Sequence, residues 1–221
     1  MTFPGIIRKL KSLKNRRNIE GMARFGIRGK NILGIPKPTL DKMARTLGKN
    51  HELALKLWDS GFHEARLLAA LMDEPDKVTP AQMEKWVKDF DSWDICDGVC
   101  GHLFDRVPAA YRKVFQWSRR KREYEKRAAF SLIAWITAHD KKAPDKVFLS
   151  FLPVIRRAAR DERNFVKKAV NWALRQIGKR NRFLNRKAIQ EAKRIQAMDS
   201  PSARWIAADA LRELAGYPVR N

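Results

Sequence analysis

Residues 165–175 read FVKKAVNWALR, and this stretch shows the pattern that runs through most of the chain. Its apolar side chains recur at intervals of three and four residues, as they do along one face of an α-helix. The other face, continued by one more turn, carries Lys168, Trp172, Arg175 and Lys179. The stretch therefore predicts a helix that buries one side and presents cations and an indole ring on the other.

The same spacing continues from Thr39 to Gly216, interrupted by Pro, Gly or Asn at intervals of about fifteen residues. No alternation of apolar and polar residues competes with it, so no strand is expected. The chain is predicted to be all-α. The predicted helices span residues 39–48, 51–60, 63–72, 80–90, 92–104, 108–119, 124–140, 145–160, 165–179, 186–198 and 202–215.

These helices pair naturally into antiparallel hairpins of about 35 to 40 residues each. That period is typical of a HEAT-like solenoid with one concave face, and we expect it to form a single domain over residues 1–221. Successive hairpins show no strong residue-for-residue similarity. A compact irregular helix bundle therefore remains the alternative architecture.

Residues 1–20 are basic and amphipathic, with apolar side chains at helical spacing among lysines and arginines. They contain neither the apolar core nor the cleavage site of a signal peptide. We expect one N-terminal surface helix here, and a mitochondrial-type presequence is the alternative.

The chain carries 47 Lys and Arg against 24 Asp and Glu, a formal charge of +23. Solubility requires far less, so the expected partner is a polyanion. The longest apolar runs, residues 128–136 and 147–155, are too short to span a bilayer, and no membrane crossing is expected. Basic residues concentrate between 119 and 187, which predicts an electropositive side, although any single lysine could simply be solvated.

Cys96 and Cys100 lie four residues apart within an apolar helical pattern, which favours small buried residues over a disulfide or a zinc site. The four histidines are scattered and have no metal-ligand spacing with the cysteines. We therefore expect no metal and no cofactor. A reducing, cytoplasmic setting and a monomeric protein, associated with the nucleoid when bound to DNA, are also expected.

The sequence WDICDGVCG, which begins at Trp93, holds the first candidate for chemistry. Trp93 and Asp97 are one helical turn apart on the same side, so an aromatic face and a carboxylate could flank a cation. Gly98 and Gly101 are costly in a helix and are expected to leave open space beside Asp97. The alternative is that Asp94 or Asp97 caps the helix while Trp93 fills the core.

The exposed face of residues 165–179 is the second candidate. An aromatic ring among arginine and lysine side chains is the composition expected where phosphates are held and bases or sugars are stacked. A buried Trp172 beside solvated cations is the alternative. Arg127 is the third candidate, because it begins the most apolar helix and should line a groove or pair with an acid. Taken alone, the position of Arg127 favours a structural salt bridge over a contact with phosphate.

Three blocks, in this order and with this separation, resemble the AlkD-like DNA alkylation repair family. They read SWDICD at residues 92–97, KRAA at 126–129 and FVKKAVNWALR at 165–175. The similarity extends from about residue 21 to residue 216, with weaker agreement at 34–36 and 63–66.

This resemblance implies a HEAT-like solenoid that holds duplex DNA in a concave basic cleft and excises purines alkylated at N3 or N7. It implies that Trp93 and Trp172 form the aromatic walls of the cleft and that Asp97 is the catalytic carboxylate. Arg127 and Arg175 would contact the DNA backbone.

Three other functions stay open. Some relatives look like DNA binders without clear excision activity, so a non-enzymatic module for damaged or unusual DNA is the main alternative. A solenoid adaptor for acidic proteins would explain the repeats but not the paired tryptophans and arginines. An RNA-binding role is compatible with the charge, although the common RNA-recognition motifs do not occur in the sequence.

Overall fold

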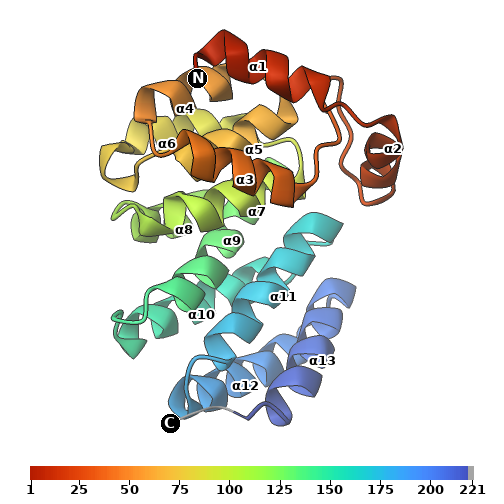
Figure 1. The fold of residues 1–221 in the computed structure, drawn as a ribbon. Coiled ribbons are helices and arrows are strands. Elements are labelled where there is room, and N and C mark those ends of the chain that lie inside the picture. Colours follow the sequence, from red (N-terminus) through yellow and green to blue (C-terminus); the bar gives the residue numbers. More distant parts are fainter. Residues whose placement is uncertain (219–221) are drawn as a thin grey trace. The chain divides into compact units, whose positions relative to one another are not determined.

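The computed structural model describes residues 1–218, and within this range every regular element is a helix (Figure 1). The last three positions of the predicted single domain lie outside the described residues. The α-helices are α1 Phe3–Ser12, α2 Arg16–Arg24, α3 Lys37–Leu47, α4 His51–Asp59, α5 His63–Met72, α6 Pro80–Lys88, α7 Trp93–His102, α8 Ala110–Trp117, α9 Glu123–His139, α10 Asp145–Ala158, α11 Asn164–Gly178, α12 Arg182–Gln196 and α13 Pro201–Ala215. Two 3₁₀ turns, η1 Pro75–Lys77 and η2 Phe104–Arg106, complete the set.

The all-α prediction is confirmed, and most predicted helix bounds lie within a few residues of those in the structure. The single helix predicted for residues 1–20 is wrong, because α1 ends at Ser12 and α2 begins at Arg16. The side chain of Asn15 accepts a hydrogen bond from the Asn18 N–H and so starts a new helix. Asn181 caps α12 in the same way, so that α12 begins at Arg182, four residues earlier than the predicted start at Arg186.

The chain forms two compact units, residues 1–107 and residues 108–221. The expectation of one domain over residues 1–221 stays a prediction. None of the helices within residues 1–218 is both long enough and apolar enough to cross a bilayer.

In the first unit, α4 packs against α5, and α5 also contacts α3 and α7. Three side-chain hydrogen bonds join residues separated by 31 positions. Glu64 binds the Leu33 N–H, the Trp58 indole donates to Asp89, and His63 pairs with Asp94. The repeat in this unit is therefore shorter than the predicted hairpin period.

The second unit contains a row of three helices, α9, α11 and α13, with α11 in the middle. Helices α10 and α12 pack against each other and against α11 and α13 respectively. Within the row, hydrogen bonds run from Arg127 to the Phe165 carbonyl, from Asn171 to Asp209 and from Arg175 to Glu213. Each joins residues 38 positions apart, a spacing within the predicted period.

A buried carboxylate fixes the segment between α2 and α3. Glu64 accepts hydrogen bonds of 2.6–3.2 Å from the backbone N–H groups of residues 33–35. Gly34 has a φ of +75°, and an added Cβ there would lie 2.4 Å from the Asn15 carbonyl oxygen. Asn18 in turn donates to the Gly34 carbonyl over 2.9 Å. The left-handed glycine thus lets α2 approach this segment closely.

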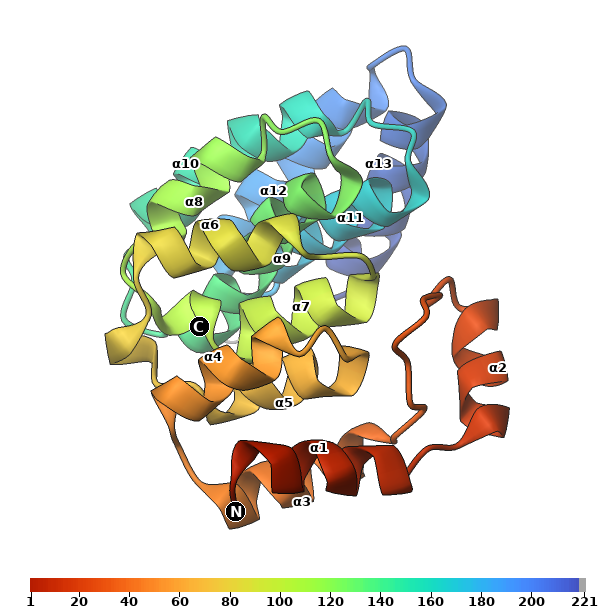
Figure 2. The ribbon, with the colours of Figure 1, turned by 90° about the horizontal axis from the view of Figure 1, so that it is seen from above.

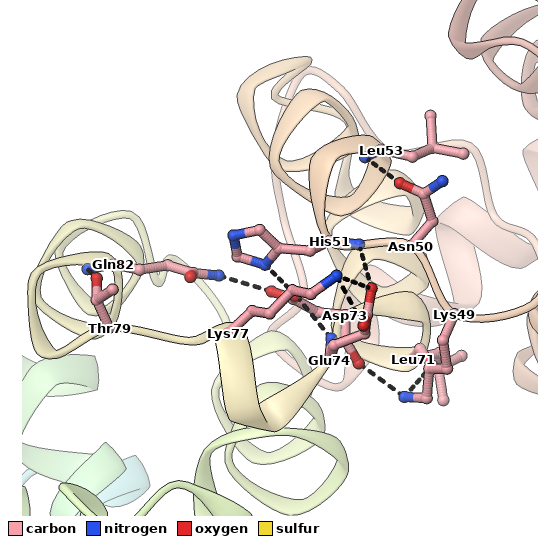
Figure 3. A network of polar contacts seen from close by, with 10 residues as sticks. All are labelled: Lys49, Asn50, His51, Leu53, Leu71, Asp73, Glu74, Lys77, Thr79 and Gln82. Carbon is pink, nitrogen blue, oxygen red and sulfur yellow. Dashed lines mark hydrogen bonds and ion pairs between the residues drawn. The ribbon is translucent and has the colours of Figure 1, made fainter.

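A second polar network joins α4, the end of α5 and α6 (Figure 3). The fully buried Asp73 lies 2.7 Å from His51 Nδ1 and accepts hydrogen bonds from Gln82 and from the Glu74 N–H. Lys49 Nζ donates to the Asp73 carbonyl. Each of these partners stabilises the junction between successive helix pairs, so the network is structural.

Candidate nucleic-acid interface

Helix α7 carries Trp93 and Asp97 as predicted, one turn apart and both half-buried. The opposite face of the helix is fully buried and includes Cys96 and Cys100, which confirms that the cysteines are small core residues. Trp93 does not fill the core. Its indole N–H donates to the Phe25 carbonyl over 3.0 Å, and the side chain lines a cavity beside α2.

The glycines of α7 do not leave open space beside Asp97, and that expectation is wrong. A Cβ added to Gly98 would lie 3.0 Å from the Cδ2 atom of Leu67 on α5, which is tighter than most van der Waals contacts. Gly101 is itself buried. The physical reason for Gly98 is therefore the close approach of α7 to α5.

Asp94, which lies between Trp93 and Asp97 in the sequence, forms an ion pair with His63 that was not predicted from the sequence. Asp94 Oδ2 is 2.8 Å from Nε2 of His63, whose side chain is only 5% exposed. Burial alone would lower the pKa of His63, but the hydrogen bond and charge of Asp94 raise it above its ordinary value of 6.5. Burial would raise the pKa of Asp94, and the bond from His63 lowers it instead.

These shifts predict how the stability of the first unit depends on pH. The contribution of His63 is complete below pH 6.5 and is lost as the pH rises through its raised pKa. The contribution of Asp94 is present above pH 3.8 and is lost only as the pH falls through its lowered pKa. Between about pH 6 and about pH 9, the free energy of unfolding should fall in the parent protein and fall less in His63→Gln. Urea titrations at both pH values measure this, and equal losses in the two proteins would contradict it.

On α11, the half-buried Trp172 packs edge-on against Trp135 of α9, with ring centroids 5.4 Å apart and an interplanar angle of 86°. Trp135 also contacts His139, at a centroid distance of 4.9 Å. Sequence reasoning missed Trp135. The 37 positions between the two tryptophans nearly match the 38-residue spacing of this unit, which is the signal that could have found it.

The predicted DNA-binding cations of α11 differ in their surroundings. Arg175 forms ion pairs with Glu213 and Asp209 of α13, and Lys179 forms one with Glu213. Lys168 is exposed, and its side chain has no ion pair or hydrogen bond within residues 1–218. Two of the three cations therefore already have an internal counterion.

Arg127 lies in the first turns of α9 and is only 6% exposed. Its guanidinium donates a hydrogen bond to the Phe165 carbonyl at the start of α11. The side chain thus bridges α9 and α11. Contact between Arg127 and a DNA phosphate stays a prediction.

Exposed cations of the second unit are not confined to the row that contains α11. Lys126 and Arg163 both form ion pairs with Asp161, and they hold the pKa of this carboxyl at about 2 although burial would raise it. Other cations are exposed on α10, α12 and the segment after α10. They include Arg157, Arg160, Arg182 and Arg186. Charge alone therefore does not select one face of this unit.

The predicted site residues fall into two groups. Trp93 and Asp97 belong to the first unit, whereas Arg127, Trp172 and the cations of α11 belong to the second. Each group is assembled within its own unit. A shared site that uses both is a proposal.

Hydrogen bonds that recur between helices at a separation of 31 residues in the first unit and 38 residues in the second are typical of a helical-repeat protein, and the fold is HEAT-like. A solved structure described as "a new family of proteins related to the HEAT-like repeat DNA glycosylases with affinity for branched DNA structures" matches with a TM-score of 0.80. The match covers 98% of this chain and 97% of the other, at 17% sequence identity. The sequence profile of the family described as "DNA alkylation repair enzyme" matches residues 6–214, and the chain belongs to this family.

Two Listeria relatives are also similar in sequence. The uncharacterized protein Lin0241 of Listeria innocua is 25% identical over 199 residues, which cover 88% of this chain and 87% of that protein. The uncharacterized protein Lmo0209 of Listeria monocytogenes is 34% identical over 89 residues. That match covers 39% of this chain and only 40% of the length of Lmo0209.

Proposed function

We propose that this protein binds duplex DNA and excises purines alkylated at N3 or N7. The observation that carries the proposal is the pair Trp93 and Asp97, which lie one turn apart and half-buried on α7 of a chain in the DNA alkylation repair family. A carboxylate beside an indole ring suits a site where positive charge develops.

The proposed reaction needs little acid catalysis. A purine alkylated at N3 or N7 is cationic, so the C1′–N9 bond can break with both of its electrons leaving on the base, which becomes neutral. The sugar becomes an oxocarbenium cation, water adds at C1′, and the water loses a proton. A carboxylate about 4 Å from this cation, at an effective dielectric near 20, stabilises it by about 4 kcal/mol, or about a thousandfold in rate.

In this proposal Asp97 supplies the carboxylate that stabilises the sugar cation, and it also orients the attacking water. Trp93 and Trp172 each add a cation–π attraction of about 0.5–2 kcal/mol and exclude bulk water. Arg127, Lys168, Arg175 and Lys179 hold the flanking phosphates, so that the lesion stays in register. In the free protein Glu213 forms ion pairs with two of these cations, Arg175 and Lys179, so phosphates of the DNA have to displace that carboxylate.

Glu213→Gln should therefore tighten duplex binding by about three- to tenfold at low salt and make its salt dependence steeper. The substitution frees Lys179 from its ion pair and leaves Arg175 paired with Asp209 alone, and each additional phosphate contact adds about 0.9 to the slope of log affinity against log salt. Fluorescence anisotropy with a labelled duplex at several salt concentrations measures both quantities. Glu52→Gln removes an exposed acid of α4 and controls for net charge. Unchanged or weaker binding by Glu213→Gln would remove these two cations from the interface.

Release of methylated bases tests the enzymatic proposal directly. The parent protein, incubated with DNA that has been treated with a methylating agent, should release 3- and 7-methylpurines and leave abasic sites. Chromatography of the released bases identifies which of them is removed. If none exceeds spontaneous depurination under conditions where the protein is bound, the excision proposal fails.

A non-enzymatic role in binding unusual DNA is the second candidate. It is favoured by the structural neighbour over 98% of the chain, which is described as having affinity for branched DNA structures. Comparing the affinity for a four-way junction with that for a linear duplex of equal length separates the two functions. Strong junction preference without base release would support the binding module.

A further inference from the structure

The first unit contains a cavity of about 750 Å³ beside α2. Figures 1 and 2 both show α2 at the side of the unit, connected by the segments that precede and follow it. The cavity is bounded by α2, by the segment that Glu64 fixes, and by α3, α5 and α7. Its apolar wall is formed by Met22, Phe25, Ile35, Leu40, Leu67 and Trp93.

Two aromatic side chains belong to this wall. Phe25 is 71% exposed, and its carbonyl oxygen accepts a hydrogen bond from the indole N–H of Trp93. This hydrogen bond holds the end of α2 against the start of α7 and uses the only polar atom of the indole. The rings are left to make stacking contacts, which are the contacts that nucleobases offer.

The charges around the cavity are also informative. Two of the acidic side chains that line the cavity already have partners within the protein. Glu64 accepts hydrogen bonds from three backbone N–H groups, and Asp94 pairs with His63. Lys37 pairs with Asp41. Arg17 and Arg24 on α2 are exposed and form no ion pair within residues 1–218, and Glu20 is the acid that lies between them on the same helix. An anionic group on the ligand would therefore find two guanidinium groups available.

We propose that this cavity binds one unpaired nucleotide of a DNA strand. The base lies against Phe25 and Trp93, and its phosphate lies near Arg17 and Arg24. The volume falls within the range of about 300–1,000 Å³ that is usual for small-ligand pockets, so a single base and sugar fit. The inference rests on the proposed DNA-binding function and deepens it, because it assigns a site for the strand that is not base-paired.

Gly21 offers a way to fill the cavity without straining the fold. It lines the cavity within α2, and a Cβ added there meets no atom within 4 Å. Gly21→Leu therefore occupies the space while favouring the helix. Gly216→Leu is the matched control, because Gly216 follows α13 in the second unit and a Cβ there also meets open space.

The probes are two duplexes of the same sequence, one with a single bulged 2-aminopurine and one fully paired. The parent protein should bind the bulged duplex about tenfold more tightly and quench the 2-aminopurine fluorescence, because the unpaired base stacks on an aromatic ring. Gly21→Leu should lose both effects and still bind the paired duplex like the parent. Phe25→Ala should reduce the quenching, and Gly216→Leu should change neither.

The outcomes separate the two proposals. If the parent binds the paired duplex but shows no preference for the bulge, or if Gly21→Leu keeps that preference, the cavity proposal is overturned alone. Equal weakening of both duplexes by Gly21→Leu would also overturn it. If the parent binds neither duplex, the proposed DNA-binding function fails together with it.

Discussion

Asp97→Asn is expected to lower the single-turnover rate of methylpurine release by about a thousandfold, while its affinity for the same DNA stays within about twofold. The amide keeps the shape of the carboxylate and removes its charge. A charge that acts only on the oxocarbenium ion contributes to the transition state and hardly to the bound substrate. The rate and the affinity should therefore separate.

The measurement uses enzyme in excess over methylated duplex, so that product release does not limit the rate. Asp76→Asn, which changes an exposed aspartate in η1, controls for the loss of one negative charge. A rate of release by Asp97→Asn equal to that of the parent would remove Asp97 from the chemistry. Loss of DNA binding would instead assign Asp97 a structural role in α7.

Glu64→Ala is expected to lower the free energy of unfolding by at least about 3 kcal/mol. The substitution leaves three backbone N–H groups without their acceptor, and each unsatisfied buried donor costs about 1–3 kcal/mol. A cavity in place of the buried side chain adds to this cost. The loss is a large part of the stability of an ordinary domain, so the first unit should melt at a distinctly lower temperature.

Urea unfolding followed by far-UV circular dichroism measures the effect, with Glu52→Ala on the exposed face of α4 as the control. Glu64→Gln tests the mechanism if the alanine variant does not fold. Its amide oxygen can still accept part of the network, whereas its NH₂ group faces another donor, so an intermediate loss is expected. Equal stability of Glu64→Ala and Glu52→Ala would show that the hydrogen bonds of residues 33–35 contribute nothing.

The helices were predictable because their signal is local. The three- and four-residue spacing of apolar side chains defined most helices from Lys37 onward, and the Trp93 and Asp97 pair followed from the geometry of one turn. The break between α1 and α2 was missed although its signal, the capping residue Asn15, is also local. There the amphipathic pattern continues across the break and conceals it.

Contacts between helices were not predictable in the same way. The pairing of Arg175 with Glu213 and of His63 with Asp94 depends on how neighbouring helices are aligned, and that alignment differs between separations of 38 and 31 residues. The role of Gly98 depends likewise on Leu67, a residue of another helix. A sequence pattern shows which residues share a helix face but not which residues of another helix lie opposite them.

Glu213 has a further consequence for the anions that α11 can attract. An incoming anion has to bind Arg175 and Lys179 more strongly than the carboxylate of Glu213, which already contacts both side chains. Chloride or a free carboxylate at cellular concentration gains little by such an exchange, whereas closely spaced phosphates on a rigid polymer deliver several charges at once. If α11 binds DNA as proposed, the acid on α13 sets a threshold, so that Arg175 and Lys179 exchange their carboxylate for a dense line of phosphates and not for dilute small anions.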